Sequence, residues 1–135
     1  MSYSFGLGGL KIGFSFLPDF VDNFIGRRYN MAYYLFQVAY TSKAWAEQVK
    51  RPQNRVELVR PVVEKLGGSI VGAWLSFGEY DIVAILQMPD NVSQAAFAIA
   101  GAASGHLKTV KTTPLMSIDE KLDVLKKAGG LDYPR

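Results

Sequence analysis

The stretch that most constrains this chain runs from residue 70 to residue 88, where apolar residues alternate on both sides of a short turn. The turn reads Phe77-Gly78-Glu79-Tyr80-Asp81. Alternation on either side of such a turn predicts a β-hairpin. Gly78 and Glu79 are predicted to form a two-residue type II′ turn, because that turn takes glycine at its first central position.

The rest of the chain predicts strands and helices in a regular order around this hairpin. The first half is expected to contain a strand over 33–40, a helix over 42–66 that Pro52 interrupts, and the first hairpin strand over 70–77. The second half is expected to contain the other hairpin strand over 80–88, a helix after Asp90 and a strand over 107–115. A last helix is expected to begin at the capping box of Ser117 and Glu120. Thr41 or Ser42 is expected to cap the first helix. The order βαββαβ with one further helix predicts an α+β protein with a ferredoxin-like fold and an antiparallel sheet.

The hairpin register assigns its side chains to two faces, because side chains alternate along a strand. The face predicted to pack on the helices carries Val71, Ala73, Leu75, Phe77, Tyr80, Ile82, Ala84 and Leu86. The other face carries Ile70, Gly72, Trp74, Ser76, Asp81, Val83, Ile85 and Gln87, which is too apolar a set to face water. Since helices of this fold cover one side of the sheet, we predict a homodimer with sheet-on-sheet contact.

Composition excludes several functional classes. The 135 residues contain no cysteine, which rules out disulfides, thiol catalysis and Cys-ligated zinc and favours a cytoplasmic location. The net charge of +3 is spread along the chain, so no nucleic-acid face is expected. No apolar stretch approaches the ~20 residues of a transmembrane helix. With a single histidine and no carboxylate cluster beside it, neither a metal site nor a cofactor is expected.

Residues 1–30 differ in composition from the rest and are predicted to be a Gly- and Phe-rich extension, with the compact domain spanning residues 31–135. Two interpretations remain open. The extension is either a simple addition to the domain, or an arm over residues 1–29 that docks on a larger assembly, because exposed phenylalanines need burial.

From about residue 31 to about residue 128 the chain resembles the GYD-domain family. The matching segments are Gly78, Tyr80 and Asp81 with Glu79 inserted, together with 34–38, 52–56, 60–68 and 111–115. The resemblance implies a ferredoxin-like fold of the dimeric α/β-barrel kind. It brings no established activity and no catalytic residues. Other dimeric α/β barrels include cofactor-free monooxygenases and isomerases, an analogy at the level of fold alone.

Three residues are candidates for catalysis. Tyr80 and Asp81 are either a proton donor and acceptor at the mouth of a cleft or parts of a turn, and their predicted opposite faces favour the turn. His106, the only histidine, is either a general base or haem ligand, or an exposed loop residue beside a helix end.

Four residues are candidates for ligand binding. Asn54 and Arg55 follow the irregular backbone at Pro52, where an Arg fork can hold a carboxylate or phosphate; the alternative is a solvated helix face. Trp45 is either part of a flat apolar pocket for an aromatic ligand or part of the core or an interface. Lys111 either faces a cleft or lies at a solvent-facing strand end.

Three functions therefore remain open. The first is a small-ligand-binding or regulatory dimer without catalysis. The second is a cofactor-independent enzyme, of the monooxygenase or isomerase kind, acting on a small organic compound. The third is an interaction subunit that docks through its N-terminal arm.

Overall fold

The computed structural model describes residues 4–7, 10–13 and 31–135. The chain divides into two compact units, Met1–Met31 and Ala32–Arg135. In the first unit, β1 (Ser4–Leu7) pairs with β2 (Leu10–Gly13) as an antiparallel hairpin. Most of the predicted extension lies outside the described residues, so its role as a docking arm stays a prediction.

The second unit is built on one four-stranded antiparallel sheet with the strand order β4-β5-β3-β6. The strands are β3 (Ala32–Tyr40), β4 (Ser69–Leu75), β5 (Ile82–Met88) and β6 (Leu107–Leu115). Helical segments connect β3 to β4 and β5 to β6, while β4 and β5 follow each other directly. This is the predicted ferredoxin-like βαββαβ arrangement, and the fold class is confirmed.

Four helices complete this unit: α2 (Ser42–Lys50), α3 (Arg55–Lys65), α4 (Asn91–Ala103) and α5 (Ile118–Gly129). The predicted interruption at Pro52 is confirmed, because α2 ends before it and α3 begins after it. Thr41 caps α2 by accepting a hydrogen bond from the backbone of Ala44 at 3.2 Å. The capping box of Ser117 and Glu120 begins α5 as predicted. None of the helices in residues 31–135 combines the length and apolarity that crossing a bilayer requires.

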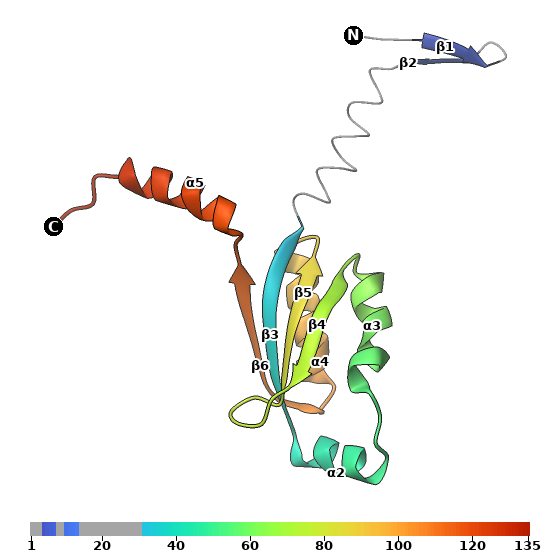
Figure 1. Cartoon of the computed structure of the whole chain (residues 1–135). Coiled ribbons are helices and arrows are strands. Elements are labelled where there is room, and N and C mark those ends of the chain that lie inside the picture. The colour runs from blue at the N-terminus through green and yellow to red at the C-terminus, as the bar shows by residue number, and fades with distance from the viewer. Residues whose placement is uncertain (1–3, 8–9, 14–30) are drawn as a thin grey trace. The chain divides into compact units, whose positions relative to one another are not determined.

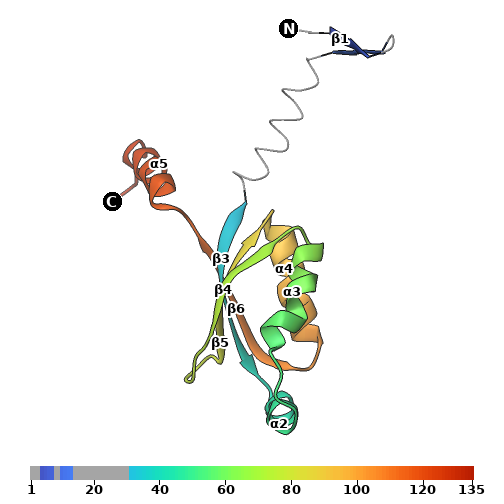
Figure 2. The same ribbon diagram turned by 45° about the vertical axis from the view of Figure 1, so that its right-hand side comes forward.

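One face of the sheet packs against α3 and α4 (Figures 1 and 2). Alternate residues of β3 and β5 point into this layer, and with Val63 of α3 and Phe97 of α4 they form the core. The phenolic hydroxyl of buried Tyr34 donates to the side-chain oxygen of Asn91 at the start of α4, which ties the centre of the sheet to the helix.

The tip of the β4–β5 hairpin differs from the prediction. Leu75 pairs with Ile82 and Trp74 with Val83, the register that a two-residue turn at Gly78 and Glu79 implies, but the strands end there and a longer connection follows. Gly78 does not have the positive φ that a type II′ turn requires, so the predicted turn type is wrong. Phe77 is also not packed on the helices, because it lies in this connection with 94% of its surface exposed.

The base of β4 contains a second difference, a shift of register between Ile70 and Gly72. The irregularity places Val71 outside the alternation, and its side chain is 56% exposed. Ile70 in turn packs against the core on the helix side of the sheet. The predicted faces of these two residues are therefore wrong, since one extra residue in a strand reverses every face before it.

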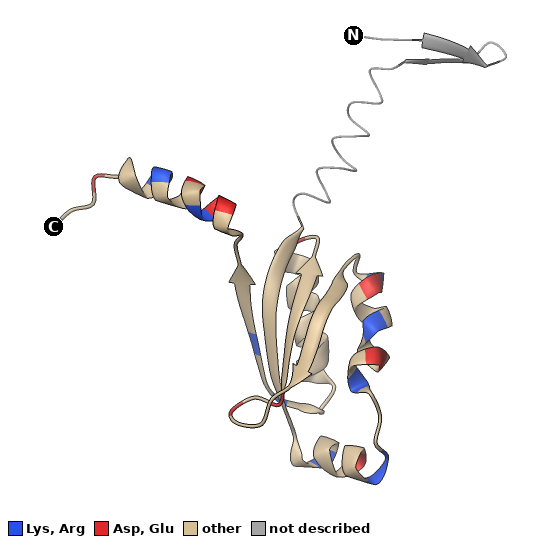
Figure 3. Cartoon of the chain, viewed as in Figure 1, with Lys and Arg blue, Asp and Glu red and all other residues tan. Residues whose placement is uncertain are grey.

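The other face of the sheet has no helix over it. Trp74 is 58% exposed on this face, and a Cβ added at Gly72 would lie 2.6 Å from its ring, so the indole lies along the sheet. The strands β3, β4 and β5 contain no charged residue, and charges gather instead on α2, α3 and α5 (Figure 3). The apolar side chains of α5 are exposed as well, with Leu122 at 55%. Residues 31–135 thus present two apolar surfaces that nothing within them covers.

Candidate functional site

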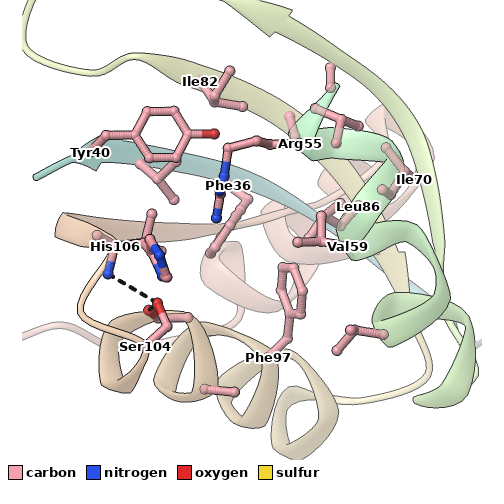
Figure 4. Close-up of a pocket in the computed structure, with 18 residues that line it drawn as sticks. Phe36, Tyr40, Arg55, Val59, Ile70, Ile82, Leu86, Phe97, Ser104 and His106 are labelled. Carbon is pink, nitrogen blue, oxygen red and sulfur yellow. Dashed lines mark hydrogen bonds between the residues drawn. The ribbon is translucent and has the colours of Figure 1, made fainter. Parts of the chain in front are cut away.

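A pocket of about 260 Å³ lies between the sheet and the helices α3 and α4 (Figure 4). Most of its wall is apolar and comes from the helix side of the sheet and from the facing sides of the two helices. The residues that line it are Phe36, Val38, Tyr40, Arg55, Val56, Val59, Val62, Ile70, Ala73, Ile82, Ala84, Leu86, Phe97, Ala100, Gly101, Ser104, His106 and Leu107. A concave apolar cavity with few polar groups is typical of small-molecule sites.

The polar groups gather at one end of the pocket, where three segments of the chain meet. Figure 4 shows Tyr40, Arg55, Ser104 and His106 at this end, with Val59 and Phe97 at the other. They come from the end of β3, the start of α3 and the turn after α4. The pocket therefore has one polar end and an apolar body.

Two hydrogen bonds from Thr41 fix the turn after α4 against the end of β3. The amide of Thr41 donates to the carbonyl of His106 at 2.9 Å, and the Thr41 hydroxyl donates to the carbonyl of Gly105 at 3.2 Å. Gly105 has a φ of 78°, a left-handed conformation that glycine adopts without strain. This tight turn redirects the chain from α4 into β6 and brings His106 to the polar end.

Tyr40 is held in place by its neighbours. Its ring contacts Trp45 edge to face, with centroids 5.1 Å apart, and the Arg55 guanidinium carbon lies 5.8 Å from the ring centroid. Burial, with a smaller contribution from Asp81, raises the pKa of the Tyr40 phenol, which the positive charge of Arg55 partly offsets. The hydroxyl therefore stays protonated at neutral pH and can donate a hydrogen bond.

Arg55 is the first residue of α3 and reaches from the helix to the polar end (Figure 4). Its position follows from the helix start, because Asn54 caps α3 by accepting from the amide of Glu57 at 3.3 Å. Within the described residues no carboxylate lies within 4 Å of Arg55, whereas Arg60 on the same helix pairs with Glu57 at 2.8 Å. The charge of Arg55 is thus left available at the pocket.

His106 and Ser104 have partners of their own. The Nε2 atom of His106 lies 3.4 Å from a carboxylate oxygen of Glu47 on α2. The Ser104 hydroxyl donates to the carbonyl of Gly101 at 2.6 Å and accepts from the amide of His106 at 3.2 Å. The Ser104 hydroxyl therefore donates its hydrogen bond within the turn and not to the pocket. The imidazole of His106, in contrast, contacts Glu47 and also lines the pocket.

The two predicted candidates in the hairpin lie outside the pocket and make structural contacts. A carboxylate oxygen of Asp81 accepts from the amide of Tyr40 at 2.8 Å, and the Asp81 amide donates to the carbonyl of Val38 at 2.8 Å. The carbonyl of Tyr80 accepts from the Ser76 hydroxyl at 2.7 Å. Asp81 thus joins the hairpin to the end of β3 through the backbone of Tyr40, the tyrosine that lines the pocket.

The remaining candidates fall in different places. His106 and Arg55 line the pocket, and Trp45 supports it through Tyr40. Asn54 lies outside it, in a separate hollow between α3 and β4. Lys111 pairs with Gln37 in the sheet and does not line the pocket. No group of three metal-ligating side chains occurs in the described part of the chain.

Three aromatic residues line the pocket that were not expected there from the sequence: Tyr40, Phe36 and Phe97. Strand alternation holds part of the signal, because Phe36, Val38 and Tyr40 share one face of β3. The same alternation is equally typical of an ordinary core. A pocket wall can be told from a filled core only by the tertiary structure, in which the end of β3 lies beside the start of α3 and the turn after α4.

Comparisons with known proteins give a family and similar solved structures. Among these structures is a transcriptional regulator from Neisseria meningitidis in complex with L-methionine. The alignment with it has 12% identity, covers 76% of this chain and 67% of that chain, and has a TM-score of 0.43. A search of curated proteins found no significant match. The family model of the GYD domain matches residues 34–125, which is more than half of the chain. The chain belongs to the GYD-domain family.

Proposed function

We propose that this protein binds a small organic ligand in the pocket between the sheet and the helices α3 and α4. The observation that carries the proposal is the pocket itself, an apolar cavity with donor groups gathered at one end. A volume of about 260 Å³ is below the ~300–1,000 Å³ of pockets for drug-sized ligands, so the ligand is compact. Its binding is the basis of a ligand-dependent or regulatory role.

We propose further that the binding protein is a homodimer. The uncovered face of the sheet supports this, because Trp74 and Tyr33 are exposed on it and three of its four strands carry no charge. A second copy of the same face is a self-complementary cover for such a surface. The alternative of a cofactor-independent enzyme stays a prediction. Of its three expected catalytic residues, His106 lines the pocket, whereas Tyr80 and Asp81 do not.

The pocket is tested by filling it. Ala100 and Ala102 are both exposed residues of α4, but only Ala100 lines the pocket. In native mass spectrometry of the full chain, we expect the wild type to retain a small molecule or to bind added compact apolar compounds. Ala100→Leu should weaken this binding about tenfold or more, a loss of about 1.4 kcal/mol or more, because the longer side chain takes up space in the pocket that the ligand needs.

The matched control is Ala102→Leu, which should bind as the wild type does. Circular dichroism of both variants checks that each is folded. Equal binding by the wild type and a folded Ala100→Leu variant would show that the ligand lies elsewhere, and the proposal would then be wrong.

A further inference from the structure

The charges around the pocket distinguish between classes of ligand. Arg55 is the one lining residue that is charged at every physiological pH, and no described residue that lines the pocket is acidic. The other groups at this end, the Tyr40 hydroxyl and the His106 imidazole, can both donate hydrogen bonds. Such a set repels a cationic ligand and is complementary to an anionic one.

Arg55 is also placed as a recognition group and not as a member of a surface ion pair. Its guanidinium carbon lies 5.8 Å from the centre of the Tyr40 ring at the polar end (Figure 4), and the part of the chain that is described places no carboxylate within 4 Å of it. A guanidinium beside an apolar cavity has lost part of its hydration, and the neutral Tyr40 hydroxyl is an acceptor for only one of its five N–H donors. An anion that enters the pocket would supply a charged acceptor for the others.

The size and apolarity of the rest of the pocket restrict which class of anion can bind. A single planar guanidinium fork matches a carboxylate, which it can hold through two parallel hydrogen bonds. Beyond this end the wall consists of Phe36, Phe97 and aliphatic side chains, so the remainder of the ligand must be apolar. A phosphate group carries a second negative charge and would need more cationic partners than Arg55 alone, the one permanently charged residue that lines this cavity.

We infer that the ligand is a compact apolar carboxylic acid whose carboxylate is bound by Arg55 and whose hydrocarbon part, a single ring or a short chain, lies between Phe36 and Phe97. The inference rests on the proposed function, since it names the ligand class of the same pocket. Tyr40 donates to the carboxylate from the side of β3. His106 lies at the same end, where Glu47 orients its ring.

The test compares an acid with its neutral isostere. The ¹⁵N-labelled full chain is titrated with 3-phenylpropanoate and with 3-phenylpropanamide, and amide shifts of pocket residues such as Val59 and Ala100 are followed. We expect the acid to bind about tenfold or more tightly than the amide. The estimate follows from the ~1.5–3 kcal/mol of a hydrogen bond to a charged group, with about 1.4 kcal/mol for each factor of ten.

Arg55→Gln should remove this preference, so that acid and amide bind with equal, weak affinity. Arg55→Lys keeps the charge but loses the fork and should bind the acid with intermediate affinity. The control is Arg51→Gln, which removes a nearby exposed arginine that does not line the pocket and should leave both affinities unchanged. The dispersion of the amide spectrum reports whether each variant is folded.

The possible results separate the inference from the proposed function. If acid and amide shift the pocket residues with equal affinity, or if Arg55→Gln leaves the preference for the acid intact, the pocket still binds a small molecule but the inference is overturned. If neither compound, nor the shorter pair of hexanoate and hexanamide, shifts a pocket residue, both the inference and the proposed function fail.

Discussion

Asp81 shows how a single residue of the family signature serves the pocket without entering it. Its carboxylate accepts from the amide of Tyr40, and its amide donates to the carbonyl of Val38. The pairing of β3 with β5 ends at Val38 and Ile82, so the amide of Tyr40 lies just beyond this ladder and needs another acceptor. Asp81 supplies it and thereby fixes the backbone that carries the Tyr40 ring.

Replacing Asp81 should therefore cost stability. In Asp81→Ala the amide of Tyr40 loses its acceptor in a partly buried position, and we expect a loss of about 1–3 kcal/mol in urea unfolding. Asp81→Asn retains an oxygen that can accept and should lose less. Glu79→Ala, an exposed change in the same connection, should stay within about 0.5 kcal/mol of the wild type. An Asp81→Ala variant with the same free energy of unfolding as the wild type would contradict this role for the carboxylate.

The helix α4 depends on its first turn for more than its own stability, because it forms one wall of the pocket and ends in the turn that carries His106. Asp90 caps it by accepting from the amide of Ser93 at 2.7 Å. This hydrogen bond lowers the pKa of Asp90 below its ordinary value. The cap is therefore strongest when the carboxyl is ionised.

The lowered pKa predicts acid sensitivity of a defined sign. A carboxyl with a lower pKa in the folded state stabilises the protein above its unfolded pKa and loses this effect as the pH falls through the folded value. The urea midpoint of the wild type should therefore fall between pH 7 and about pH 3 by more than that of Asp90→Asn, whose cap does not titrate. Glu57, whose pKa Arg60 also lowers, contributes equally to both proteins. Parallel midpoints across this range would contradict the role of Asp90.

At the scale of the whole molecule, two apolar surfaces remain uncovered within residues 31–135: the open face of the sheet and one side of α5. Figures 1 and 2 show no helix over the open face. An exposed tryptophan lying along strands that carry no charged residue is typical of a surface that another protein covers. We expect a second copy to be that protein.

A charge on this face should separate the dimer. Trp74→Glu is expected to halve the mass measured by light scattering at micromolar concentration, because burying an unpaired carboxylate in an apolar contact costs several kcal/mol. Leu58→Glu is the matched control, since Leu58 is almost equally exposed but lies on α3. It should leave the mass unchanged. A monomeric wild type, or equal masses for the two variants and the wild type, would contradict the dimer.

Local patterns in the sequence account for most of the fold. Alternation over β5, the break at Pro52 and the capping box at Ser117 each depend on a few neighbouring residues, and each predicted its element correctly. The family resemblance pointed to the same topology. The predictions for the hairpin tip and for the faces of Ile70 and Val71 were wrong. The bulge and the longer connection depend on contacts with β3 and the core, and a short stretch of sequence contains no information about such contacts.

The sequence by itself determined the order of the elements and the apolar character of both faces of the sheet, since each depends on residue type and spacing along the chain. Only the tertiary structure decided which residues form the pocket. Tyr40, Arg55 and His106 come from three separate elements, and their meeting depends on the hydrogen bonds of Thr41 and on how α3 and α4 pack over the sheet. Hydrophobic periodicity carries no information about such long-range convergence, because it is the same for a filled core and for a cavity.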